Sequence, residues 1–117
     1  MKIKYSDILN ADEALSQIAK EKVTIGEAVS ISRLIKAIQE EFEIFNQHQK
    51  DLLDKYGTVV DGNYKIEDGE NLKKFNKDFS ELLNCEVDIA IEPVKITSDI
   101  KINAETVMLG EKFIIFE

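Results

Sequence analysis

The sequence is poor in several residue types on which common active sites depend. It contains one cysteine, one histidine and one proline among 117 residues, and it has no tryptophan. The single cysteine, Cys85, cannot form an internal disulfide, which fits a reducing compartment and removes any cysteine-based metal framework. The single histidine, His48, excludes histidine-rich metal sites and would have to carry a catalytic triad alone.

Glycine-rich motifs are also lacking. The five glycines are too scattered to make a phosphate-cradling loop, and they stand at positions 26, 57, 62, 69 and 110. The acidic stretch after Asp61 has Lys65 and Ile66 where a calcium loop requires an oxygen ligand and a glycine. No serine lies in a nucleophile elbow. We therefore expect no metal, no other cofactor and no enzymatic activity.

Long apolar runs are absent, and so is an excess of positive charge. A membrane span requires about 20 apolar residues, and no apolar stretch near Met1 has the form of a signal peptide, so we expect a cytoplasmic protein with no membrane contact. The formal net charge is −8, and Arg33 is the single arginine. Direct nucleic-acid binding is therefore not expected, because it depends on clustered lysine and arginine side chains.

The composition that remains is that of one folded domain. Hydrophobic residues make up 44% of the chain and charged residues 32%, both near globular norms. A chain of this length buries enough surface for one core, and we expect a single domain over residues 1–117.

A long amphipathic helix is the central prediction. Thr24 and Glu27 form a capping box, and Gly57 supplies the left-handed cap expected after Tyr56. Between them, residues at alternating steps of three and four form one stripe: Ala28, Ile31, Ile35, Ile38, Phe42, Phe45, Gln49, Leu52 and Tyr56. Such a helix is about 50 Å long, whereas a small domain is about 30 Å across. Something must cover the stripe.

Shorter elements precede and follow this helix. Residues 1–5 alternate as an edge strand, and Ser6 or Asn10 can cap a helix that ends near Glu21. The Asp61-Gly62 pair predicts a hairpin over residues 59–66, and a third helix follows over 72–84. Strands over 86–92 and 94–96, a helical turn over 103–109 and a strand over 112–116 complete the chain. The fold class expected is α+β: a long helical hairpin, a third helix, and a small antiparallel sheet made of the β-hairpin and C-terminal strands.

The stripe has two possible partners. The first and third helices, about 24 Å and 20 Å long, could cover it within one chain. Alternatively, a second copy could pack against it, with Gln49 fixing the register as buried polar residues do in coiled coils. The candidate interface on that second hypothesis is Ile31, Ile35, Ile38, Phe42, Phe45, Gln49 and Leu52.

Three segments carry a resemblance in layout. They are residues 9–15, residues 52–66 with their Tyr56-Gly57 and Asp61-Gly62 pairs, and residues 79–91. In these segments the chain resembles a family of uncharacterised small proteins of tailed phages and prophages of Gram-positive bacteria, a domain of unknown function. The likeness covers most of the chain, and its motifs are helix ends, a hairpin and core positions. It implies a fold and a phage setting in a bacterial host cell, and it implies no activity.

Two functions fit these observations. The first is a non-catalytic phage protein-interaction module, an assembly helper or structural accessory, that binds a protein partner or a second copy of itself through the long helix. The second is a small acidic phage inhibitor or decoy that occupies a host defence protein, a nucleic-acid-binding protein or a signalling nucleotide.

Overall fold

The computed structural model describes residues 1–117, and its longest element is helix α2, Ile25–Tyr56. Thr24 caps α2, because its side-chain oxygen accepts the Glu27 N–H at 3.2 Å while the Glu27 carboxylate accepts the Thr24 N–H at 3.1 Å. The molecule measures 51 × 28 × 21 Å. A helix that rises about 1.5 Å per residue therefore runs along nearly all of it. The predicted long helix and its capping box are confirmed.

The C-terminal end of α2 differs from the prediction at Gly57. Its φ is −112°, which is not the left-handed conformation expected. Glycine is required for a different reason: a Cβ here would lie 2.8 Å from the Leu53 carbonyl oxygen, the atom that accepts the Gly57 N–H. The Lys65 carbonyl oxygen of β3 would lie 3.2 Å from the same Cβ, so the close approach of this strand to the end of α2 also favours glycine.

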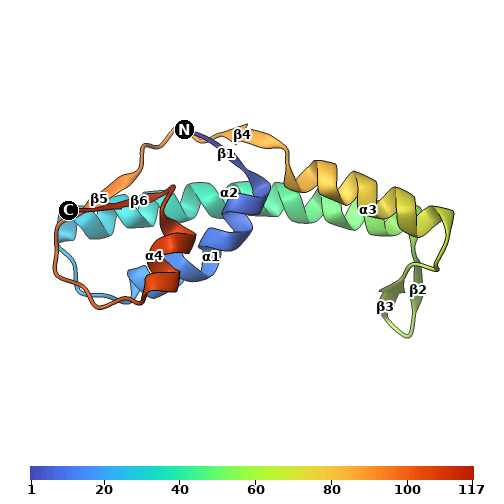
Figure 1. The fold of residues 1–117 in the computed structure, drawn as a ribbon, viewed down its shortest axis with the longest axis horizontal. Coiled ribbons are helices and arrows are strands. Elements are labelled where there is room, and N and C mark those ends of the chain that lie inside the picture. Colours follow the sequence, from blue (N-terminus) through green and yellow to red (C-terminus); the bar gives the residue numbers. More distant parts are fainter.

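Two groups of elements pack along different halves of α2 (Figure 1). The head contains the N-terminal half of α2 with β1 (Lys2–Lys4), α1 (Tyr5–Ala19), β4 (Glu86–Asp88), β5 (Val94–Ile96), α4 (Ala104–Gly110) and β6 (Ile114–Phe116). The stalk contains the C-terminal half of α2 with α3 (Glu70–Leu83) and the hairpin of β2 (Thr58–Val60) and β3 (Asn63–Lys65). Figure 1 shows α3 lying along α2 and the hairpin at the far tip.

The strands form three separate two-stranded ladders. β1 pairs with β4 and β2 with β3, both antiparallel. β5 and β6 pair in parallel, with Val94 opposite Ile114. The predicted α+β class with a long helix is confirmed, but the C-terminal ladder is not antiparallel as expected. The connection through α4 returns the chain to the end of the head where β5 begins, so β6 runs in the same direction as β5.

The hairpin at the tip turns at Asp61 and Gly62, whose φ angles are 52° and 80°. Positive φ at both central residues is the geometry that an Asp-Gly pair favours in a two-residue turn. The predicted hairpin is confirmed.

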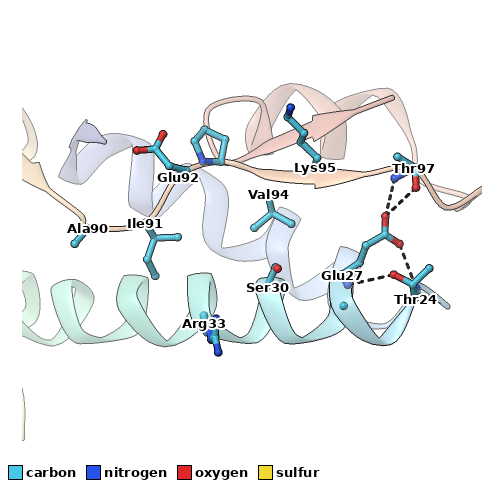
Figure 2. A pocket seen from close by; sticks show the side chains of 12 residues that line it. Thr24, Glu27, Ser30, Arg33, Ala90, Ile91, Glu92, Val94, Lys95 and Thr97 are labelled. Carbon is cyan, nitrogen blue, oxygen red and sulfur yellow. Dashed lines mark hydrogen bonds between the residues drawn. The ribbon is translucent and has the colours of Figure 1, made fainter.

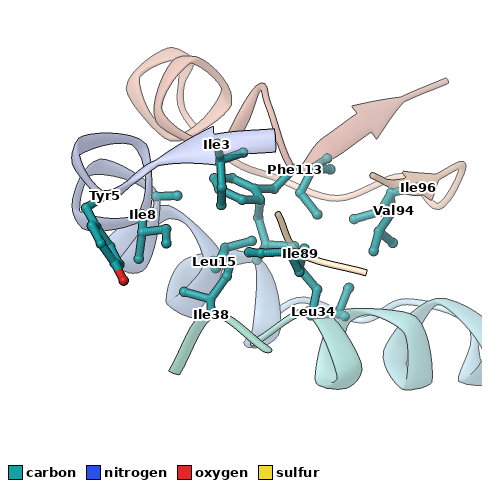
Figure 3. Close-up of a cluster of buried hydrophobic side chains, with 14 of the residues drawn as sticks. Ile3, Tyr5, Ile8, Leu15, Leu34, Ile38, Ile89, Val94, Ile96 and Phe113 are labelled. Atoms are coloured by element: carbon teal, nitrogen blue, oxygen red, sulfur yellow. The ribbon is translucent and has the colours of Figure 1, made fainter. Parts of the chain in front are cut away.

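The hydrophobic core lies in the head, between α1, α2 and the strands (Figure 3). Its largest fully buried side chains are Phe113, Ile8, Ile18, Leu34 and Ile96. The predicted apolar face of α1 is confirmed at Ile8, Ala11, Leu15 and Ile18, while Ala19 is exposed. Each fully buried aliphatic side chain contributes about 1.5–3 kcal/mol relative to its exposed state.

Helix α1 begins at Tyr5, before either predicted cap. The Lys4 N–H donates to the Asp7 carboxylate at 3.0 Å, and Lys112 Nζ lies 3.0 Å from the same carboxylate. Lys112 is 105 residues away in the sequence, so part of this cap comes from tertiary structure.

Candidate interaction surfaces

The seven residues of the predicted interface lie inside the chain. Ile31, Ile38 and Phe45 are buried, and Ile35, Phe42, Gln49 and Leu52 are partly buried. Helix α1 covers the N-terminal part of the stripe, and α3 covers the C-terminal part. The stripe therefore packs largely within one chain, as the first of the two possibilities expected, and an interface with a second copy along its partly buried members stays a prediction.

Phe45 shows how the stripe is covered. Its ring centroid lies 5.4 Å from that of Tyr5 in α1 and 6.0 Å from that of Phe79 in α3. The Phe42 ring lies 6.3 Å away in the same helix. Phe45 thus stands at the junction where the head meets the stalk.

Exposed large apolar side chains lie at both ends of α2, and others lie in the middle of α2 at Ile44, on α4 at Val107 and Met108, and on β6 at Ile115. At the N-terminal end of α2, Ile25 is 83% exposed and Val29 is 44% exposed. At the tip of the stalk, Val59 is 64% exposed and Val60 48%. Ile25 and Val29 are four residues apart and lie on one side of the helix, off the stripe. That spacing was the signal in the sequence that could have identified them.

A groove lies beside the N-terminal end of α2 (Figure 2). Its volume is about 790 Å³, and it runs between α2 and the extended segment 90–97. Gly26, Ser30 and Arg33 line it from α2, while Ile91 and Val94 point toward the helix from the segment. The spacing 26, 30, 33 places the three helix residues on one face. Small residues at two of these positions leave the groove open.

Glu27 closes one end of the groove. Its carboxylate accepts the Thr97 N–H at 2.7 Å, the Ser98 hydroxyl and the Thr24 N–H. These hydrogen bonds, that of Ser98 first, lower the Glu27 pKa from 4.5 to about 2. The ionised Glu27 carboxylate is thus hydrogen-bonded within the chain, and these bonds link the start of α2 to the residues that follow β5.

The strand β5 offers one free pair of backbone groups on the groove side. Val94 N–H donates to Phe113 at 2.8 Å, and the Ile96 carbonyl accepts from Glu117 at 3.0 Å. Because polar groups alternate sides along a strand, the N–H and carbonyl of Lys95 face away from β6. The Thr97 N–H has the same orientation, and it is the one that Glu27 accepts.

Arg33 lies where the groove meets the apolar patch of Ile25 and Val29. It lines both the groove and a shallower hollow of about 360 Å³ over that patch, which Lys36 also lines. The three ion pairs of the molecule involve other residues, and no side-chain hydrogen bond involves Arg33. In a chain of net charge −8, this end of α2 therefore presents two unpaired cations beside apolar surface.

The remaining candidate groups are scattered. His48 is exposed on α2, and Cys85 is exposed between α3 and β4. No group of three or more histidine, cysteine, aspartate or glutamate side chains is placed to hold a metal ion. No helix has an apolar stretch of the length and composition needed to cross a membrane.

Comparison with protein-family models, with curated proteins and with solved structures gives no match to this chain. Function is therefore inferred from the geometry and charge of the surfaces described above.

Proposed function

We propose that this chain is a non-catalytic protein-interaction module of a phage or prophage, an assembly helper or structural accessory acting in the cytoplasm of a bacterial host cell. It contacts a protein partner, or a second copy of itself, through surfaces at the two ends of the long helix. The observation that carries the proposal is that each end presents two exposed apolar side chains close together in the sequence, Ile25 and Val29 at one and Val59 and Val60 at the other.

The energetics of exposure support this reading. An isoleucine that is 83% exposed gains little from folding, but it gains about 1.5–3 kcal/mol when a partner covers it. Apolar patches bordered by polar groups are typical of interaction sites. One continuous helix joins the two ends, so it holds them at a fixed separation within a molecule 51 Å long.

The hairpin at the tip of the stalk also exposes apolar side chains. Every residue of β2 and β3 is exposed, and an isolated two-stranded hairpin is at best marginally stable in water. The Tyr64 hydroxyl donates to Asp54 of α2, which anchors the hairpin to the long helix. A partner that packed on Val59 and Val60 would stabilise the hairpin further.

Site-specific photo-crosslinking tests the proposal. A photoreactive amino acid is placed at Ile25, at Val59 or at Glu40, an exposed control position on α2, in cells that carry the phage or prophage. We expect protein crosslinks from both end positions and none from the control. Absence of crosslinks at both ends would refute the proposal.

The control position also addresses the acidic-inhibitor alternative. Glu40 and Glu43 are exposed on α2. An inhibitor that used this acidic surface would crosslink its target from Glu40 in preference to Ile25 or Val59. That result would replace the interaction-module proposal with the inhibitor.

A further inference from the structure

The unpaired cations at the N-terminal end of α2 narrow the class of partner. We infer that the groove between α2 and segment 90–97 binds a short extended segment of a partner protein that carries a carboxylate beside an apolar side chain. Arg33 receives the carboxylate, and Ile25 and Val29 receive the apolar side chain. This inference rests on the proposed function and specifies one of its two surfaces.

Arg33 has the position and the free donors for this role. Its guanidinium makes no ion pair within the chain, and it borders both the groove and the hollow over Ile25 and Val29. A guanidinium can bind a carboxylate through two parallel hydrogen bonds. Arginine is enriched among the residues that dominate binding energy at protein interfaces.

The neighbouring charges favour an acidic segment. Lys36 lies one turn beyond Arg33 and is also unpaired. Glu27 stays ionised, but its oxygens accept hydrogen bonds from Thr97 and Ser98 within the chain. Glu92 is the other carboxylate at the groove, and its side chain points away from α2 in Figure 2. The hollow over Ile25 and Val29, in contrast, is lined by the cations Arg33 and Lys36 and by no carboxylate, which is complementary to a carboxylate of a partner.

The shape of the groove favours a short extended chain. Its volume of about 790 Å³ lies within the range typical of binding pockets and accommodates a few side chains. Gly26 lets a backbone approach α2, because a Cβ at this position would meet no atom within 4 Å. Lys95 offers one backbone N–H and one carbonyl to the bound segment. Pro93 has no N–H to donate, and the Thr97 N–H already donates to Glu27. A bound segment could therefore pair with the backbone of β5 only around Lys95.

Nucleic acid fits this surface poorly. Arg33 and Lys36 are two isolated cations on a strongly acidic chain, whereas binding to a phosphate backbone requires several clustered cations to release counterions. A carboxylate next to an apolar group would contact both the cations and the apolar side chains of the site.

A peptide selection tests the inference. Random peptides of about 12 residues, displayed on a carrier, are selected on the immobilised full-length protein, and binding of the selected peptides is measured by fluorescence anisotropy. We expect them to combine aspartate or glutamate with leucine, isoleucine or phenylalanine. Arg33→Glu should weaken them at least about tenfold, and Ile25→Ser should weaken them less. Circular dichroism verifies that each variant is folded.

Two control variants locate the site. Lys74→Glu makes the same change of charge on α3, where Lys74 is exposed, and should leave affinity unchanged. Val59→Ser alters the tip of the stalk and should also have no effect. Replacing the peptide's acidic residue by lysine should restore binding to the Arg33→Glu variant, because the lysine and the new glutamate then form the same ion pair with its charges exchanged.

Each contrary outcome has one meaning. Equal affinity for Arg33→Glu and Lys74→Glu, a preference for basic peptides, or the recovery of no binder overturns the groove assignment. Peptides lost with Val59→Ser but retained by Arg33→Glu overturn it while leaving the interaction module in place. If light scattering shows a dimer that Arg33→Glu dissociates, the occupant is a second copy, and the assignment to a separate partner is overturned.

Discussion

The head and the stalk share one helix but bury their apolar residues to different extents. In the head, α2 contributes fully or nearly fully buried side chains, such as Leu34 and Ile38, to a core shared with α1, β5 and Phe113. In the stalk, α3 presents a strongly apolar face to α2, yet none of its residues is buried. The same kind of helical pattern therefore gives a core where several elements converge and a partly solvated seam where two helices meet alone.

This difference places most of the stability in the head. A residue that remains in contact with water contributes only part of its transfer free energy, so α3 and the hairpin are held more weakly than α1. The stalk is also where the exposed Val59 and Val60 lie. A weakly held, partly apolar arm suits a surface that becomes fully ordered when a partner covers it.

Removing the aromatic junction should have the largest effect. Phe45→Ala deletes a buried ring that contacts Tyr5 and Phe79, and we expect a loss of about 3–5 kcal/mol in the free energy of unfolding. Phe75→Ala is the matched control, since Phe75 is partly buried and stacks on Phe79 alone, at 5.6 Å. Urea denaturation measures both. Equal losses would show that the stalk is packed as tightly as the junction.

A matched pair of leucine substitutions compares the stability that one side chain contributes in the head and in the stalk. Leu34→Ala removes a side chain that is 0% exposed in the head and should cost about 2–5 kcal/mol. Leu72→Ala, in the partly solvated stalk, should cost about 1 kcal/mol. The same denaturation experiment gives both values. A larger cost at Leu72 would contradict the division into a stable head and a weaker stalk.

The elements of the fold that could be predicted are those with local signals. The Thr24–Glu27 capping box and the stripe of α2 involve residues within a few turns of one another, and the Asp61-Gly62 turn involves two adjacent residues. Local hydrogen bonds and side-chain periodicity determine these features, so one sequence is sufficient to predict them.

What could not be predicted depends on residues far apart in the chain. The parallel pairing of β5 with β6 depends on where α4 packs, and Lys112 reaches the Asp7 carboxylate at the start of α1 from 105 residues away. The groove forms because Glu27 binds Thr97 and Ser98, about 70 residues away in the chain. The sequence predicts the stripe of α2 and the two elements that could cover it, but it does not decide between those helices and a second copy, because that choice depends on tertiary packing.

Removing the N-terminal cap of α2 should have a smaller effect on the stability of the head. Thr24→Ala removes the side-chain oxygen that accepts the Glu27 N–H and should cost about 1 kcal/mol. Ser32→Ala, inside α2 and beyond its first turn, is the control, because the exposed Ser32 hydroxyl only donates to the Ala28 carbonyl of its own helix. Thermal unfolding followed by circular dichroism compares them. A cost at Ser32 equal to that at Thr24 would contradict the capping role.

The smallest effect should come from the pH dependence of the groove's closed end. The hydroxyl of Ser98 and the N–H groups of Thr97 and Thr24 lower the Glu27 pKa from 4.5 to about 2. Because the pKa is depressed in the folded state, ionised Glu27 stabilises the fold above its unfolded pKa, and this contribution disappears as the pH falls from 4.5 towards about 2. Solvent screening keeps the contribution small. The melting temperature of Glu27→Gln should therefore lie below that of the wild type near neutral pH, and the two should converge in acid. A difference that stays constant over this range would show that Glu27 closes the groove by shape and not by charge.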